Sequence, residues 1–330
     1  MSSQFQVVGI GNAIVDVLSH SDDSFLDIMG ISKGIMQLVE RERAELLYAA
    51  MDDRRQAPGG SVANTLSGLG HLGLKTAFLG RVRDDALGRY YVEAMETGGT
   101  RYVNPPAPDG GLPTSRSMIF VSPDGERSMN TYLGISADLG PGDVDDAAVS
   151  GTDLLFLEGY LFDKPAGKQA FLKAARLCTA AGGRAGIALS DPFCVDRHRE
   201  DFRKLVAEEM DFVIGNTHEW EALYQTTDTE AALARATQEC RVVVCTRSGE
   251  DVVLIAEGER VEVPVHRVTP VDATGAGDQF AAGFLYGLAT GRDLATCGRM
   301  GVVCAGEVIS HLGPRPQTDT RDLFRQAGLL

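Results

Sequence analysis

The chain has 330 residues, 44% of them hydrophobic, and carries a formal net charge of −15. A chain of this length buries about three quarters of its unfolded surface, which is enough for one large core and predicts a single domain over residues 1–330. The acidic excess disfavours nucleic acid as a partner, because phosphate backbones are bound by clustered Lys and Arg, whereas a small anion can still be bound by backbone N–H groups.

Short apolar runs that could form buried strands recur along the chain. They cover residues 7–10, 76–79, 154–157, 186–189, 212–214, 242–245 and 252–255. Between most of them lie stretches with helical periodicity, at residues 62–72, 88–95, 168–181 and 201–208. Strand and helix alternating at this spacing predict crossover units, and therefore a three-layer α/β fold with a mostly parallel central sheet.

Two segments depart from this alternation. Residues 34–39 and 114–133 look like strands with no helix between them, and the second contains the turn Pro123-Asp124-Gly125. We expect about residues 14–40 and 112–136 to form a small antiparallel sheet that stands off the main body. Ligands of open parallel sheets lie at the carboxyl ends of the strands, so this sheet would act as a lid over the site.

Two polar residues follow the first predicted strand. Asn12 and Asp16 are four positions apart, so an extended chain places both side chains on one face. Asp16 could then accept hydrogen bonds from a pair of hydroxyls. The alternative interpretation is that both are turn or capping residues.

The strongest local pattern covers residues 271–284, VDATGAGDQFAAGF. Gly275, Ala276 and Gly277 allow a tight turn into a helix whose first N–H groups lack intrahelical partners and carry partial positive charge. Phosphoryl transfer needs such an anion hole, and Asp278 could accept the proton of an attacking hydroxyl beside it. The same residues would also fit a simple helix start, in which Asp278 favours the N-terminus.

Together these patterns resemble the PfkB (ribokinase-like) family of carbohydrate and nucleoside kinases. Residues 272–283 are similar to the family's C-terminal signature, and residues 59–64 (GGSVAN) with 80–88 (GRVRDDALG) are similar to its N-terminal signature. The resemblance extends from Val7 to about Gly313. It implies a ribokinase-like fold with a small β-sheet lid, Asp278 as the catalytic base, and ATP and Mg²⁺ as cofactors.

The resemblance also implies how the acceptor and the phosphates are bound. Asp16, Gly60, Ser61 and Asn64 would bind a ribose-like diol, with Asn12 adjacent. Arg127, on the predicted lid, matches a lid arginine of adenosine-kinase-like relatives that would neutralise the transferring phosphoryl group, although an exposed hairpin arginine alone indicates only a solvated charge.

Further matches concern the metal and the nucleotide. Asn216 and Glu219, in the run NTHE, match an N-x-x-E element that organises Mg²⁺, with Glu219 acting through water; alone, Glu219 would suit a helix start. Thr246 and Gly249 would lie against the nucleotide, although Ser248 stands where relatives commonly have glycine. Asp272 and Thr274 match a monovalent-cation site, which makes K⁺ a candidate cofactor.

Other site types find little support. Ile14 occupies the third glycine position of the run that begins at Gly9, which weakens a dinucleotide fingerprint, and Leu74 spoils a near P-loop. The six cysteines are scattered and never form a C-x-x-C pair, which indicates reduced core thiols and no zinc site. The start, Met1 to Gln4, shows no signal-peptide pattern, and no apolar run reaches the ~18 residues of a membrane span, so we expect a soluble cytoplasmic protein.

We therefore expect an ATP-dependent kinase of a ribose-containing small molecule, first of all adenosine. Residues 158–162 (EGYLF) and 189–193 (LSDPF) resemble adenosine kinases more than ribokinases, and Tyr160 or Phe162 could stack on a purine. The alternatives are a sugar kinase acting on ribose, fructose or 2-keto-3-deoxygluconate, and a non-catalytic ligand-binding relative. The oligomeric state is expected to be monomer or homodimer.

Overall fold

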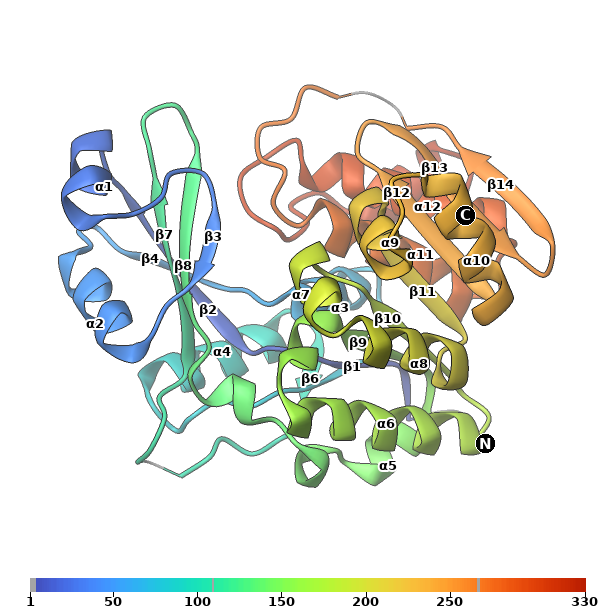
Figure 1. Cartoon of the computed structure of the whole chain (residues 1–330), viewed down its shortest axis with the longest axis horizontal. Helices are drawn as coiled ribbons and strands as arrows, with labels where there is room; N and C mark the ends of the chain where they lie inside the picture. Colours follow the sequence, from blue (N-terminus) through green and yellow to red (C-terminus); the bar gives the residue numbers. More distant parts are fainter. Residues whose placement is uncertain (1–3, 109, 266–267) are drawn as a thin grey trace.

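The computed structural model describes residues 4–108, 110–265 and 268–330, and within these residues the chain forms two sheets (Figure 1). Met1 to Ser3, which belong to the segment in which we expected no signal peptide, lie outside the described residues. The larger sheet has the strand order β14-β13-β12-β11-β10-β9-β1-β5-β6. Its strands are β1 (Phe5–Ile10), β5 (Thr76–Leu79), β6 (Thr100–Tyr102), β9 (Thr152–Glu158), β10 (Arg184–Ala188), β11 (Phe212–Asn216), β12 (Val242–Arg247), β13 (Glu250–Ala256) and β14 (Glu259–Val263).

The large sheet is mostly parallel, as predicted. Every neighbouring pair from β12 to β6 is parallel, and β13 and β14 add an antiparallel hairpin at one edge. Strand β1 shows why these strands appear in the sequence as continuous apolar runs. Val7 packs into one core, whereas Val8 and Ile10 point to the opposite face and pack into a second.

Helices cover both faces of this sheet, which confirms the three-layer α/β class (Figure 1). The first core lies under α3 (Ser61–His71), α4 (Ala86–Thr97), α11 (Ala276–Ala289), α12 (Leu294–Val308) and α13 (Thr320–Gln326). The second lies under α5 (Asp146–Ser150), α6 (Pro165–Ala180), α7 (Pro192–Arg197), α8 (Arg199–Glu209), α9 (Thr217–Tyr224) and α10 (Thr229–Glu239). Short 3-10 helices span Gly134–Asp138, Pro141–Asp143 and Gly159–Asp163.

The smaller sheet stands at the left of the main body in Figure 1, and we call it the lid sheet after its predicted role. Its strand order is β3-β8-β7-β2-β4. The strands are β2 (Ile14–His20), β3 (Met36–Leu38), β4 (Arg55–Pro58), β7 (Ser115–Val121) and β8 (Arg127–Tyr132).

The prediction of an antiparallel lid sheet was wrong. The β7–β8 and β2–β4 pairs are antiparallel, but β2 pairs with β7 and β3 with β8 in parallel. The reason is that β2 and β7 both begin at the main body, where Ile14 pairs with Ser115, and run outward together. The sequence patterns also missed β4 and the helices α1 (Asp23–Met29) and α2 (Arg41–Ala50).

The two faces of the lid sheet have different neighbours. Leu26 of α1 and Leu47 of α2 share a core with Phe120, so these helices cover one face. On the other face a row crosses β2, β7, β8 and β3, and it consists of Asp16, Ser117, Thr131 and Leu38. Arg127 lies on the same face of β8, four residues before Thr131.

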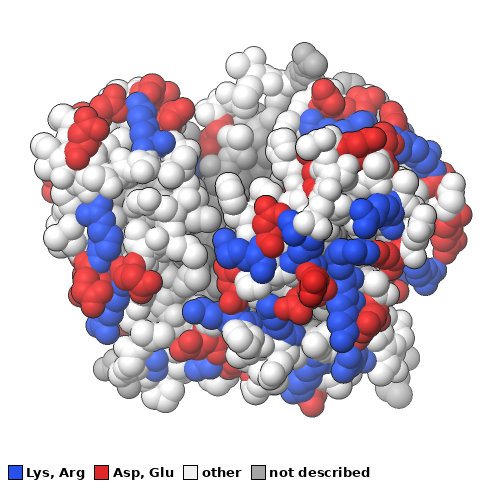
Figure 2. Space-filling model, in the orientation of Figure 1, with Lys and Arg blue, Asp and Glu red and all other residues white. Residues whose placement is uncertain are grey.

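Strand β1 sets the position of the site. It lies between β5 and β9, and the chain leaves its carboxyl end directly into the lid sheet. Strands β5 and β6 lie on one side of β1 and strands β9 to β14 on the other, so the direction of strand addition reverses at β1. Ligands of open α/β sheets bind at such a switch point. Figure 2 shows a hollow between the lid and the main body on the side that faces the reader.

Candidate active site

A buried carboxylate joins the ends of β1 and β9. Glu158, the last residue of β9, accepts hydrogen bonds from Asn12 N (3.1 Å) and Asn12 Nδ2 (2.7 Å) through Oε1, and from Val62 N (3.1 Å) through Oε2. Asn12 Oδ1 in turn accepts from Ser136 Oγ (2.6 Å). Burial raises the pKa of Glu158 to about 7 against the effect of these donors.

This network changes the predicted role of Asn12 and adds a residue. The amide of Asn12 is engaged within the buried network, so Asn12 holds the loop between β1 and β2 in place. Among the described residues, no hydrogen bond joins Asn12 to the Asp16 carboxylate. Glu158 was missed as a site residue. A signal was present, since Glu158 is a charged residue that directly follows the apolar run 154–157.

Asp16 presents an unengaged carboxylate to the space between lid and main body. Gly59 packs so closely that a Cβ there would lie 2.6 Å from both Asp16 oxygens, and Gly60 has a φ of 94°, with its missing Cβ directed at the Asn12 carbonyl. Burial raises the pKa of Asp16 to about 7, while Arg315 and Arg127 lower it. No described residue donates a hydrogen bond to this carboxylate, so its oxygens can accept hydrogen bonds from the hydroxyl groups of a ligand.

The first turn of α3 holds Asp278. Ser61 Oγ donates to Oδ1 (2.6 Å) and Asn64 Nδ2 donates to Oδ2 (3.0 Å). Thr65 Oγ1 binds the Asp278 carbonyl (3.0 Å), so α3 and the start of α11 are joined by three contacts. Burial raises the pKa of Asp278 to about 6, against the lowering effect of these donors and of Arg315. The carboxylate is therefore ionised at neutral pH and has more basic character than an exposed Asp.

The N-terminus of α11, where the sequence predicts an anion hole, has two N–H groups available instead of three. Gly275 is the N-cap residue with a φ of 81°, and Gln279 N makes the first helical bond, to Gly275 O (2.8 Å). Ala276 N already donates to Ala273 O (3.2 Å), so Ala276 is not a free donor. Within the described residues the N–H groups of Gly277 and Asp278 donate to nothing, and a Cβ at Gly277 would meet open space. These two groups can therefore bind an anion.

Arg127 connects the lid to the loop before this helix. Its Nη2 lies 2.7 Å from Asp272 Oδ2, and its Nη1 donates to Thr274 Oγ1 at 3.3 Å. Burial acts to raise the pKa of Asp272, but donors from Gly313 and Thr274, with the Arg127 charge, outweigh burial and lower it. Arg127 thus pairs with one of the two residues, Asp272 and Thr274, that the resemblance matched to a monovalent-cation site, and that site stays a prediction.

The N-x-x-E run that was predicted to organise Mg²⁺ forms the start of α9. Asn216 caps the helix and both oxygens of Glu219 bind Asn216, through its backbone N (2.8 Å) and Nδ2 (2.7 Å). Burial, with Asp191 as a further cause, raises the pKa of Glu219 to about 7. The described residues contain no cluster of three or more His, Cys, Asp or Glu that could hold a metal. Mg²⁺ in nucleotide sites keeps several waters and uses one or two carboxylates, so Glu219 fits a role through water.

The predicted nucleotide residues lie at the same sheet edge. Thr246 pairs with Asn216 in neighbouring strands. In the turn that follows, Ser248 has a φ of 54°, which explains why glycine suits this position. Gly249 has no such requirement, and a Cβ there would meet open space.

Three aromatic residues near the site differ in environment. Phe162 is 2% exposed and packs on Phe202 with ring centroids 4.3 Å apart, so it belongs to the core. Tyr160 is half-buried, and burial with the negative charges of Asp191 and Glu219 raises its pKa. Phe193, at the start of α7, is 72% exposed.

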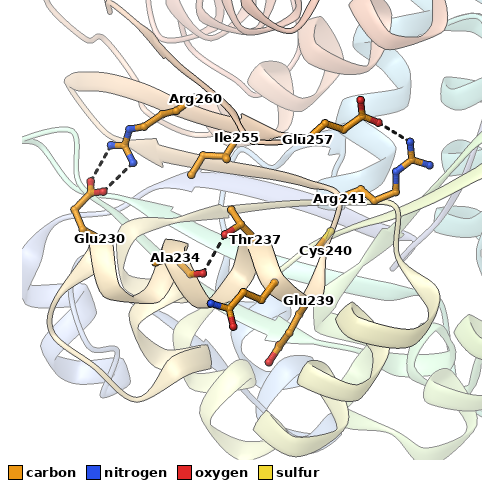
Figure 3. Close-up of a pocket in the computed structure, with 11 residues that line it drawn as sticks. Glu230, Ala234, Thr237, Glu239, Cys240, Arg241, Ile255, Glu257 and Arg260 are labelled. Carbon is orange, nitrogen blue, oxygen red and sulfur yellow. Dashed lines mark hydrogen bonds and ion pairs between the residues drawn. The ribbon is translucent and has the colours of Figure 1, made fainter.

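A separate hollow of ≈ 650 Å³ lies between α10 and the β13–β14 hairpin (Figure 3). Its charged walls are already paired, since Arg260 binds Glu230 at 2.8 Å and Arg241 binds Glu257 at 2.8 Å. None of the predicted site residues lines it. The predicted site residues therefore lie elsewhere, around the start of α11 and the lid sheet.

Two expectations about the whole chain can be compared with the structure. All six cysteines are free and buried. Among the residues that are described, no helix has the length and apolar character needed to cross a membrane. The charged side chains on the face shown in Figure 2 include both signs and gather mainly over the main body.

Comparisons with known proteins agree with this architecture. The model of the family described as pfkB family carbohydrate kinase matches residues 27–321. The curated protein 5-dehydro-2-deoxygluconokinase of Halalkalibacterium halodurans is 27% identical over 300 residues, which is 88% of this chain and 90% of that protein.

Two solved structures are similar over nearly the whole chain. A probable sugar kinase protein from Rhizobium etli is 44% identical with a TM-score of 0.92, covering 99% of this chain and all of that one. The adenosine kinase from Sinorhizobium meliloti is also 44% identical, with a TM-score of 0.91, and the match covers 98% of this chain and 100% of that one.

Proposed function

The chain belongs to the PfkB family of carbohydrate kinases, which are phosphotransferases with an alcohol group as acceptor, and we propose that it moves the γ-phosphoryl group of ATP onto a primary hydroxyl with Asp278 as the base. One observation carries this proposal. The Asp278 carboxylate is held by Ser61 and Asn64 beside the unengaged N–H groups of Gly277 and Asp278. A base and an anion hole at one helix start are what in-line phosphoryl transfer requires.

Different residues of the site bind the acceptor, remove its proton and bind the phosphates. Asp16 accepts hydrogen bonds from neighbouring hydroxyls of the acceptor and so directs its primary hydroxyl toward Asp278. Asp278 takes the proton as the hydroxyl attacks, and the N–H groups of Gly277 and Asp278 bind the charge on the phosphoryl oxygens. Arg127, on the lid, leaves Asp272 for the phosphates as the lid closes. Glu219 with Asn216 would hold the waters of a Mg²⁺ ion that binds with ATP, and this ion would supply positive charge to the phosphates.

A free sugar is the acceptor favoured by the curated relatives, which matches the alternative expected from the sequence. Several of them carry the name 5-dehydro-2-deoxygluconokinase, at 25–28% identity. A gluconate-type acceptor carries a carboxylate and needs a cation near its hydroxyl site. Arg127 and Arg315 both act on Asp16 electrostatically, so positive charge is present there.

Adenosine is the second candidate, favoured by the 44% identity to the Sinorhizobium meliloti adenosine kinase and by apolar surface beside the site. Phe193 is 72% exposed on the main body, and Leu38 is 53% exposed on the lid face that carries Asp16. A purine could be enclosed between such surfaces when the lid closes, since flat aromatic groups bind well to apolar and aromatic side chains.

An acceptor panel tests both the reaction and the substrate. ADP release is measured with MgATP and adenosine, inosine, guanosine, ribose, fructose, 2-keto-3-deoxygluconate and 5-dehydro-2-deoxygluconate. Turnover with a free sugar or sugar acid and none with adenosine establishes the first candidate, and the reverse establishes the second. If the folded protein binds one of these compounds but phosphorylates none of them, the result would support the alternative of a non-catalytic ligand-binding relative.

A matched variant strengthens the panel. Phe193→Ala should raise KM for a nucleoside about tenfold and leave KM for a free sugar unchanged, because only the nucleoside carries a flat base that can pack on this aromatic ring. An equal effect on both acceptors would remove Phe193 from the purine hypothesis.

A further inference from the structure

Three successive residues near the C-terminus are attached to three parts of the site. Gly313 N donates to Asp272 Oδ2 (2.8 Å). Pro314 lies against Gly275, where a Cβ would come within 2.6 Å of its Cα, and its carbonyl accepts from Gln279 Nε2 (3.0 Å). The backbone before Arg315 is thus fixed to the loop that forms the anion hole.

Arg315 uses this fixed position to reach α3. Its Nε donates to Asn64 Oδ1 (3.2 Å), and its Nη2 contacts Met95 Sδ (3.5 Å). Gln279 Nε2 also donates to the Asn64 carbonyl (2.9 Å), so the backbone and side chain of Asn64 are both held. The acceptor helix, the anion hole and the C-terminal segment therefore meet at one asparagine.

The chemistry of the guanidinium decides which way the Asn64 amide faces. A guanidinium has donors and no acceptor, so it can bind Asn64 through Oδ1 alone. Nδ2 is then left to face Asp278 Oδ2, where it donates at 3.0 Å. If the amide turned over, its oxygen would face a carboxylate oxygen, and Asp278 would lose one of the two side-chain donors that hold it.

We propose that Arg315 is a positioning residue for phosphoryl transfer, which fixes the Asn64 amide so that Nδ2 holds the Asp278 carboxylate and which supplies the positive charge that keeps this carboxylate ionised. The proposal rests on the proposed role of Asp278 as the base. Arg315 itself touches neither Asp278 nor the reacting hydroxyl, and it acts through Asn64 and through its charge.

The surroundings of Asp278 support the electrostatic part. The ionisable groups that interact electrostatically with it are Asp16 on β2, Glu158 at the end of β9, Tyr160 in the 3-10 helix after β9, and Arg315. Arg315 provides the positive charge among them. Burial raises the pKa of Asp278 to about 6 even with this charge present, so its loss would raise the pKa further into the neutral range.

Arg315 can also be reached from solvent. It lines a hollow of ≈ 560 Å³ between α3 and α4, together with Ser67, Tyr90 and Glu93. A small cation could enter this hollow and take the place of a truncated side chain. This property allows a direct chemical test of what the guanidinium does.

The experiment compares Arg315→Met, Arg315→Lys and Arg315→Ala with the wild-type enzyme, using an acceptor found active in the panel. Arg315→Met should lower kcat at pH 7 at least tenfold and move the low-pH fall of kcat/KM upward by at least half a pH unit. The KM of an uncharged acceptor should change less than threefold at alkaline pH, where Asp16 is ionised, whereas the KM of a sugar acid should rise because positive charge is lost. Arg315→Lys should restore the pH at which kcat/KM falls, because the positive charge is kept. It should not restore all of kcat, because an ammonium group lacks the planar, fixed N–H donors that orient Asn64 Oδ1. Guanidinium chloride at low millimolar concentration should recover part of the Arg315→Ala rate, and NaCl at equal ionic strength should not.

A matched control and an assay-free measurement complete the test. Arg321→Met, an exposed arginine of the same C-terminal region, should behave like wild type. In protein labelled with ¹³C at the Asp carboxyl carbons, the Asp278 signal, assigned by its absence in Asp278→Asn, should titrate at higher pH in Arg315→Met. An unshifted titration and an unshifted low-pH fall of kcat/KM overturn the proposal. An inactive wild type, or a fully active Asp278→Asn, overturns the proposed function, and the ¹³C titration still decides whether Arg315 acts on Asp278.

Discussion

The hydroxyl of Ser61 donates a 2.6 Å hydrogen bond to Oδ1 of Asp278, although 217 positions separate the two residues in the chain. Ser61 follows the double-glycine turn against Asp16, and Asp278 lies in the first turn of α11. The turn beside Asp16 and the proposed base are therefore joined by a direct hydrogen bond before any ligand arrives. An acceptor hydroxyl needs only to join or replace the Ser61 donor to lie beside the carboxylate.

Replacing the base by its amide should separate chemistry from binding. Asp278→Asn keeps the shape of the side chain but cannot take a proton, so kcat should fall at least ~10³-fold, within the range of general base catalysis, while acceptor affinity changes little. ADP release and calorimetric binding of the acceptor measure the two effects. As a control, Asp293→Asn changes the N-cap of α12, where asparagine caps equally well, and should retain activity. Near-normal turnover of Asp278→Asn would remove Asp278 from its role.

The raised pKa values predict that kcat/KM falls on the acid side of neutral pH. Asp278, with a pKa of about 6, and Asp16, with a pKa of about 7, must both be ionised, the first to accept a proton and the second to accept two hydroxyl hydrogens. The rate constant kcat/KM should therefore be level above pH ~7.5 and fall below it, more steeply than tenfold per pH unit once both groups protonate. A profile measured from pH 5 to 9 in ADP release tests this. A fall near pH 4, typical of exposed carboxylates, contradicts it.

Sequence patterns picked out most residues of the candidate site because their signals are local. Asp16, the turn at Gly60 and the run that ends at Asp278 each show their chemistry within a few residues, and alternation of apolar runs predicted the large sheet. What the patterns missed depends on contacts between distant segments. Glu158 acquires its role when β9 pairs with β1 and meets Asn12, 146 positions away, and Arg315 acquires its role by reaching Asn64, 251 positions away.

The lid shows the same limit in another form. Period-2 alternation predicts that β7 and β8 form a hairpin, because a turn joins them. It does not specify that β2 pairs in parallel with β7, since these strands have no turn between them and are placed by where each leaves the main body. A strand as short and polar as β4 (Arg55–Pro58) carries no alternation to detect, and the lid sheet alone reveals it.

Asp16 should reduce the stability of the folded protein where the enzyme works best. Its pKa is about 7 in the folded state and near its ordinary value of 3.8 when unfolded, so between these values the folded state binds more protons and stability falls as pH rises. Asp16→Asn should therefore raise the free energy of unfolding at pH 8, on the order of 1 kcal/mol, with the gain shrinking toward pH 4, while catalysis is lost.

Chemical denaturation at pH 4.5 and pH 8 measures this difference. Asp27→Asn, which changes an exposed carboxylate on α1 of the lid, is the matched control and should shift stability little at either pH. A variant at position 16 that is less stable at pH 8 than the wild type would show that the carboxylate makes a stabilising contact instead.

Arg127 is predicted to have two roles that one variant can separate. Its ion pair with Asp272 connects the lid to the main body without ligand, and its release toward the phosphates would stabilise the transition state. Arg127→Met should lower kcat about 10²-fold or more and speed amide hydrogen exchange in β8, because the lid loses its contact with the loop at Asp272. Lys33→Met, which removes an exposed lid cation paired with Asp23 and Asp124, should alter exchange near the hairpin and leave kcat unchanged. Faster exchange with normal kcat in Arg127→Met would mean that Arg127 serves as a latch and takes no part in phosphoryl transfer, whereas lowered kcat with unchanged exchange would mean that the ion pair contributes nothing to lid closure.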